Sequence, residues 1–147
     1  MGTDSYGLMV VFVVCVVLSA YFSASETAFS TANKIRLKSM AQDGDKKAAK
    51  ALKIIDDYDN MISAILIGNN IVNIASAAVA TVMFVEVFGD LGATLSTAFT
   101  TVVVLIFGEI TPKSIAKARP EKFTMATASL MKTIMIIFKP LVVVFAV

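Results

Sequence analysis

Residues Leu8–Ala28 read LMVVFVVCVVLSAYFSASETA, an apolar run whose C-terminal end turns polar. A helix of about 20 apolar residues is long enough to cross the hydrocarbon core of a bilayer. Two further stretches of this length follow, Met61–Val85 and Leu91–Ile110. Hydrophobic residues make up 57% of the 147 residues and charged residues only 16%, which is too apolar for a soluble domain of this size. We therefore predict an all-α integral membrane protein with three transmembrane helices.

A fourth apolar stretch, residues 123–147, is interrupted by Lys132, Lys139 and Pro140. Pro120 suits the first position of a helix, and the residue before a proline is pushed out of helical geometry, so we expect a new helix to begin there. Its spaced lysines favour a juxtamembrane helix that lies on or partly in the inner leaflet. A fourth crossing stays open as the alternative.

The distribution of basic residues predicts the topology. They gather between the first two apolar stretches and after the third, at Lys34, Arg36, Lys38, Lys46, Lys47, Lys50, Lys53, Lys113, Lys117, Arg119 and Lys122. The positive-inside rule makes both regions cytoplasmic. The N-terminal tail and the 86–90 connection carry acidic but no basic residues, so they belong outside. We predict a multi-pass protein of the cell membrane with its N-terminus outside and its C-terminus in the cytoplasm.

The connection over residues 33–60 is predicted to be helical rather than a loose loop. Its alanines lie among Lys and Gln, residue types that favour helix. We expect two short cytosolic helices with a turn near Asp43–Asp45.

The absence of some residue types narrows the possible chemistry. Cys15 is the only cysteine and the chain has no histidine, which argues against disulfides, thiolate zinc sites and imidazole catalysis. Any metal would be held by oxygen. Ser23 has no evident base to activate it, so an intramembrane enzyme is not expected. No basic patch interleaved with aromatic residues suggests a nucleic-acid partner.

The first apolar stretch carries a polar face. Ser19, Ser23, Glu26 and Ser30 follow helical spacing and line one side. A carboxylate within the membrane is costly unless it faces a bundle interior, a cavity or a cation. Ser23 is the better site candidate, because Glu26 can reach the cytosolic interface. Serines in membrane helices can also simply bond their own backbone carbonyls, and that alternative stays open.

The second stretch contains ILIGNNIVNI at Ile65–Ile74, with three amides inside an apolar span. Asn69 and Asn73 share a helical face, whereas Asn70 points about 100° away. Such amides can hold helices together by hydrogen bonds, which explains Asn70 well. Helix-to-helix hydrogen bonding explains the pair Asn69 and Asn73 less well. This pair lies beside Gly68, and a glycine lets a ligand or another helix approach the backbone.

The third stretch ends in FGEITPK at Phe107–Lys113. Proline has no N–H and its ring displaces the carbonyl four residues earlier, so Pro112 is expected to free the carbonyl of Gly108. That carbonyl and the Glu109 carboxylate would then lie side by side. Broken helices at membrane depth normally line a cavity or bind an ion. The alternative is an ordinary proline kink with Glu109 paired to Lys113.

These stretches supply nearly the six hard oxygens that Mg²⁺ or Ca²⁺ requires. The candidate ligands are Ser23, Asn69, Asn73, Gly108 (through its backbone carbonyl) and Glu109.

The three motifs, at Phe22–Phe29, Leu66–Asn73 and Phe107–Lys113, resemble in order and spacing the transmembrane domain of the CNNM/CorC family. The resemblance implies a homodimer in the lipid bilayer, an inner-leaflet juxtamembrane helix and transport of Mg²⁺ coupled to Na⁺. It also implies ion contacts at the same five residues. We expect other residues within or near these motifs to support or gate the site, namely Ser25, Glu26, Asn70, Pro112 and Lys113.

Members of that family usually continue into cytosolic domains with a nucleotide-binding CBS pair, which this sequence lacks. We therefore expect residues 1–147 to be one membrane domain cut from a longer protein, without nucleotide binding. The predicted function is a secondary Mg²⁺ transporter, with export as the favoured direction. The alternative is a non-transporting Mg²⁺ sensor or regulatory membrane scaffold.

Overall fold

The computed structural model describes residues 3–146, and within these it gives the side-chain surroundings of residues 6–144. The described part is all helical, with no β-strand. In chain order its elements are α1 (Thr3–Thr31), α2 (Lys34–Gln42), α3 (Lys46–Asp56), α4 (Tyr58–Phe88), the 3₁₀-helix η1 (Gly89–Leu91), α5 (Gly92–Val103), the π-helix η2 (Val104–Ile110), α6 (Thr111–Ala118) and α7 (Pro120–Ala146).

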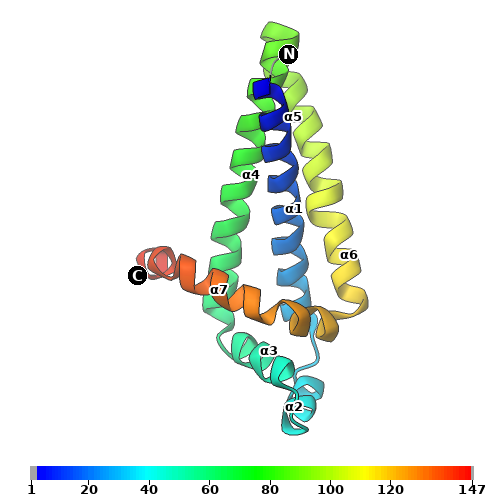
Figure 1. Ribbon diagram of the computed structural model, residues 1–147, viewed down its shortest axis with the longest axis vertical. Coiled ribbons are helices and arrows are strands. Elements are labelled where there is room, and N and C mark those ends of the chain that lie inside the picture. The colour runs from blue at the N-terminus through cyan, green and yellow to red at the C-terminus, as the bar shows by residue number, and fades with distance from the viewer. Residues whose placement is uncertain (1–2, 147) are drawn as a thin grey trace.

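Three long helical rods form an upright bundle (Figure 1). They are α1, α4 and the continuous run α5–η2–α6, which correspond to the three predicted helices. The stretches apolar and long enough to span a membrane include Tyr6–Thr31 and Tyr58–Ala118, which together cover these rods. Large apolar side chains point outward; Val17, Ile74 and Val102 are 61%, 71% and 56% exposed. Apolar residues exposed on this scale are typical of helices that face lipid.

The second and third rods are joined by a tight hairpin at η1. Gly92 packs so closely on α4 that a Cβ at this position would lie 2.5 Å from the Cα of Val85. Gly89 has a positive φ of 65°, which glycine adopts without strain. The two glycines therefore let the chain reverse within a few residues, and α5 returns alongside α4.

Helix α7 crosses the base of the bundle and does not run alongside the three rods (Figure 1). It begins at Pro120 as predicted, after Arg119 in a non-helical conformation. Length and composition would allow residues 120–144 to span a membrane. The helix continues through Pro140, so the proline that interrupts the apolar pattern does not end it.

Helices α2 and α3 lie beneath α7 and confirm the predicted pair of short helices (Figure 1). The Asn33 side chain caps α2 by accepting from the Arg36 N–H, at 3.1 Å. Asp45 caps α3 in the same way, accepting from the N–H groups of Lys47 and Ala48. Gly44, with φ 99°, makes the turn between them.

The base is held by apolar packing and carries most of the charge. Leu37, Ala48, Ala51 and Ile54 are buried against a cluster that includes Met131 of α7. All 13 basic residues of the chain lie within residues 34–139 on α2, α3, α6, α7 and their connections. At the opposite end of the bundle the charged residues among those described are all acidic: Asp4, Glu86 and Asp90.

Candidate metal site in the helix bundle

The centre of the bundle holds a hydrogen bond between two membrane-buried side chains. The Ser19 hydroxyl of α1 donates to the Asn69 side-chain carbonyl of α4 at 3.0 Å. Ser19 is fully buried and Asn69 is half-buried. The hydroxyls of Ser30 and Tyr58, 3.1 Å apart, join the same two helices nearer the base. The two contacts show that α1 and α4 run antiparallel.

The third rod reaches this point through a glycine. A Cβ added to Gly108 would lie 3.0 Å from the Ser19 hydroxyl oxygen, so only a residue without a side chain fits without displacing it. Gly68, which precedes Asn69, has a similar role on α4, because a Cβ there would lie 2.6 Å from the Phe22 ring. Three helices thus meet at the level of Ser19, and both glycines are buried there with no side chain between the helices.

The proline break takes the form of a π-helix. The Thr111 N–H donates to the carbonyl of Ile106, five residues back. Pro112 has no N–H to give. The carbonyl of Phe107 therefore lacks both its α-helical and its π-helical donor, and the carbonyl of Gly108 lacks its α-helical one. The sequence predicted a freed carbonyl at Gly108, but the π-helical donor of that carbonyl, the Lys113 N–H, is still present. The carbonyl that loses both donors is that of Phe107, because the wide turn begins well before the proline.

Two predicted ligands are buried without a hydrogen-bond partner in the described part of the chain. They are the Ser23 hydroxyl and the Asn73 side-chain carbonyl. A buried polar atom without a partner is costly and calls for an explanation such as an ion or a water. Because the helices are antiparallel, Ser23 lies one turn from Ser19 toward the base and Asn73 one turn from Asn69 the other way. At 1.5 Å per residue their backbones are about 12 Å apart along the bundle.

Glu109 is half-buried and follows the glycine that packs on Ser19. The salt bridges among the described residues are Lys34–Asp56 and Arg36–Glu121. Glu109 and Lys113 take part in neither, so the alternative of an ion pair between them is not found. The carboxylate is available to a cation.

The remaining predicted residues surround this centre at various distances. Asn70 is exposed, as expected for a side chain that points away from Asn69. Glu26 is half-buried. Ser25 is fully buried and its hydroxyl has no partner in the described chain, as is also true of the Tyr21 hydroxyl one turn earlier. The hydrogen bond between Ser19 and Asn69 includes none of these side chains.

The site has few ionisable groups. No cluster of three or more His, Cys, Asp or Glu side chains occurs among the described residues. A metal here would be held by hydroxyl, amide and backbone oxygens around one carboxylate, the donor types that hard dications accept. Ser19 belongs to this set, although the ligand prediction used only Ser23. The signal for it was its place on the polar face of α1.

These features define a multi-pass membrane protein whose three rods meet at a polar centre. The chain belongs to the CNNM family, because the Cyclin M transmembrane N-terminal domain matches residues 10–147. This confirms the resemblance to CNNM/CorC proteins.

Three bacterial relatives illustrate the family. A UPF0053 protein of Haemophilus influenzae is 42% identical over 135 residues, 92% of this chain and 32% of that protein. The UPF0053 inner membrane protein YfjD of Escherichia coli is 42% identical over 125 residues, 85% of this chain and 29% of that protein. The polyamine export protein of Salmonella typhimurium is 27% identical over 143 residues, 88% of this chain and 32% of that protein. The chain thus spans about a third of the length of these relatives.

Proposed function

We propose that this protein transports Mg²⁺ across the membrane through the polar centre of the bundle. The observation that carries the proposal is the contact of three helices at one level, where the Ser19 hydroxyl bonds the Asn69 carbonyl and Gly108 packs on Ser19. The freed carbonyls at the π-helix and the unpaired Glu109 carboxylate add acceptors at the same place. Neutral oxygens with a single carboxylate suit a site that binds a dication moderately and releases it, as transport requires.

Two of the unpartnered buried oxygens, those of Ser23 and Asn73, would mark the ends of a path. A Mg²⁺ shell with oxygens at about 2.1 Å is only some 4 Å across, so one ion cannot contact backbones about 12 Å apart. Side chains lean toward the N-terminus of their own helix, which tilts Ser23 and Asn73 toward the centre from opposite sides. In our proposal the ion is held centrally by Asn69, Gly108 and Glu109, with Ser19 in the same shell. It passes Asn73 on one side and Ser23 on the other.

The orientation and assembly belong to the same proposal. The end of the bundle that carries the lysines and arginines would face the cytoplasm by the positive-inside rule, with α7 in the inner leaflet and the N-terminus outside. Transport would be export, coupled to Na⁺ as the family resemblance implies. The exposed small residues Ala77 and Ala78 of α4 would support a homodimer, since small residues allow close helix packing in membranes.

A second candidate cargo is an organic polycation. It is favoured by one observation, the relative named as a polyamine export protein. A polyamine carries spaced ammonium groups that donate hydrogen bonds, and the carbonyls of Asn69, Asn73 and Phe107 would accept them. Polyamine binding would differ from Mg²⁺ binding, because a long cation could contact Ser23 and Asn73 at the same time whereas one Mg²⁺ could not.

Flux measurements on the full-length protein in proteoliposomes test both candidates. Under a Na⁺ gradient, liposomes loaded with Mg²⁺ should lose it, whereas liposomes loaded with putrescine should retain it. Glu109→Gln should abolish the flux, while Glu86→Gln, at an exposed acid far from the site, should leave it intact. Putrescine flux without Mg²⁺ flux would favour the second candidate. Mg²⁺ binding without any flux would favour a sensor or scaffold.

A further inference from the structure

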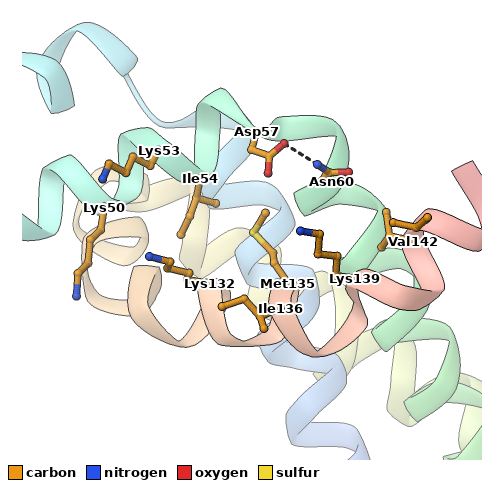
Figure 2. Close-up of a pocket in the computed structure, with 11 residues that line it drawn as sticks. Lys50, Lys53, Ile54, Asp57, Asn60, Lys132, Met135, Ile136, Lys139 and Val142 are labelled. Carbon is orange, nitrogen blue, oxygen red and sulfur yellow. Dashed lines mark hydrogen bonds between the residues drawn. The ribbon is translucent and has the colours of Figure 1, made fainter.

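A cavity of about 430 Å³ lies at the base, between α3, the start of α4 and α7. It is separate from the polar centre of the bundle. Four lysines line it, Lys50 and Lys53 from α3 and Lys132 and Lys139 from α7. Figure 2 shows Lys132 and Lys139 on the side of α7 that faces α3, with Met135 between them. A hydrogen bond of 3.2 Å from Lys50 to Ser129, 79 residues further along the chain, joins the two helices beside the cavity.

The positive charge of this cavity is not balanced by the protein. Asp57 is the one acidic residue among the described residues of its lining, against four lysines. Its carboxylate already accepts a hydrogen bond from the Asn60 amide at 2.8 Å (Figure 2). None of the four lysines takes part in a salt bridge in the described part of the chain. Ammonium groups gathered without a counter-charge favour an anionic ligand.

The rest of the lining is apolar. Apart from the Asn60 amide, it is formed by Ile54, Met135, Ile136, Val142 and Val143, and Ile136 is 62% exposed. Along α7 the exposed apolar surface continues from the cavity, with Ile137 at 65% and Val144 at 71%. A cavity with cationic and apolar walls, continuous with an apolar helix surface, matches an amphiphile with an anionic head. A soluble anion would leave the apolar walls unused.

We propose that this cavity binds the phosphate headgroup of an anionic phospholipid, with its acyl chains along the apolar side of α7. The lysine stems cover the apolar walls while their ammonium groups contact the phosphate, as expected at a membrane interface. Because α7 and α3 both supply lysines, the lipid joins the helix across the base to the cytosolic helices.

Native mass spectrometry of the full-length protein tests this. The protein is reconstituted in nanodiscs of phosphatidylethanolamine with or without phosphatidylglycerol, and the retained lipid is counted. Each lysine near an anionic surface contributes about a fivefold gain in binding, so Lys132→Gln with Lys139→Gln should weaken phosphatidylglycerol retention about 25-fold. Lys38→Gln with Lys46→Gln, at exposed lysines outside the cavity, is the charge-matched control and should retain the lipid.

Two further arms keep the test decisive. Lys132→Arg with Lys139→Arg should keep the lipid, since the charge is kept, and raising salt should release it from the unmodified protein. Equal retention of phosphatidylethanolamine, or full retention by the glutamine pair, would overturn the proposal. Displacement of the lipid by millimolar inorganic phosphate would also overturn it, because the site would then be one for free phosphate.

Discussion

The Ser19 hydroxyl and the Asn69 side-chain carbonyl lie 3.0 Å apart, although the residues are 50 positions apart in the chain. This bond joins α1 to α4 at the level where Gly108 approaches from the third rod. In the proposed function the same two oxygens bind the ion, so structure and transport depend on one contact.

Replacing Ser19 by alanine removes the donor and leaves the Asn69 carbonyl unpaired. Hydrogen bonds between membrane helices contribute about 0.6 kcal/mol on average and up to about 1.7 kcal/mol. The free energy of unfolding of Ser19→Ala should therefore be lower than that of the unmodified protein by an amount in this range. Unfolding in mixed micelles measures it. The matched control is Ser76→Ala, a buried serine that bonds Val72 of its own helix and should change stability less.

Gly108→Ala places a methyl group 3.0 Å from the Ser19 hydroxyl oxygen and should displace it from Asn69. Mg²⁺ affinity, measured by titration calorimetry, should fall roughly 10- to 100-fold, as for other disturbed ligand supports. Gly7→Ala meets nothing within 4 Å and is the control. The double variant with Ser19→Ala no longer has the Ser19 hydroxyl that the new methyl group would meet. Its loss of stability should therefore be smaller than the sum of the losses in the two single variants. Strict additivity would contradict this geometry.

At Gly68 the expected effect is on packing alone. A Cβ would lie 2.6 Å from the buried Phe22 ring, an overlap that Gly68→Ala cannot avoid. Overpacking of this kind typically costs about 1–3 kcal/mol. Adding Phe22→Leu should recover most of the lost stability in the same unfolding measurement. Failure of this rescue would show that the glycine is needed for another reason.

Pro112→Ala should separate stability from transport. Alanine restores an N–H to the carbonyls of the π-helix and removes a proline that costs about 3 kcal/mol inside a helix, so stability should rise. The freed carbonyls would be lost, and Mg²⁺ flux should fall. Pro140→Ala in α7 is the control, since it removes the other proline inside a helix without touching the site and should leave flux unchanged. Normal flux in Pro112→Ala would remove the π-helix from the mechanism.

Local chemistry made much of the fold predictable. Apolar runs of spanning length identified the three rods, and the Asp43–Asp45 turn divided the connection between the first two rods into two helices. Pro120 marked the start of α7. Its course across the base was favoured by the spaced lysines, since they would be costly in a clean crossing.

The site was harder to predict, because its geometry depends on contacts between helices. Nothing local to Ser19 says that it faces Asn69, since the register of two helices is set by packing along their whole length. For the same reason the sequence could not show that Ser23 and Asn73 lie on opposite sides of the centre. Pro112 predicted a broken hydrogen bond, but not that the wide turn would extend back to Val104.

The most direct test of the central claim is the position of the ion. Crystals of the protein soaked with Mn²⁺, which takes the same oxygen ligands as Mg²⁺, would show it by anomalous scattering. We expect a peak about 2.2 Å from the oxygens of Asn69, Gly108 and Glu109, and its loss in Glu109→Ala. A peak elsewhere, or none at saturating Mn²⁺, would contradict the proposal that three membrane helices form the ion site.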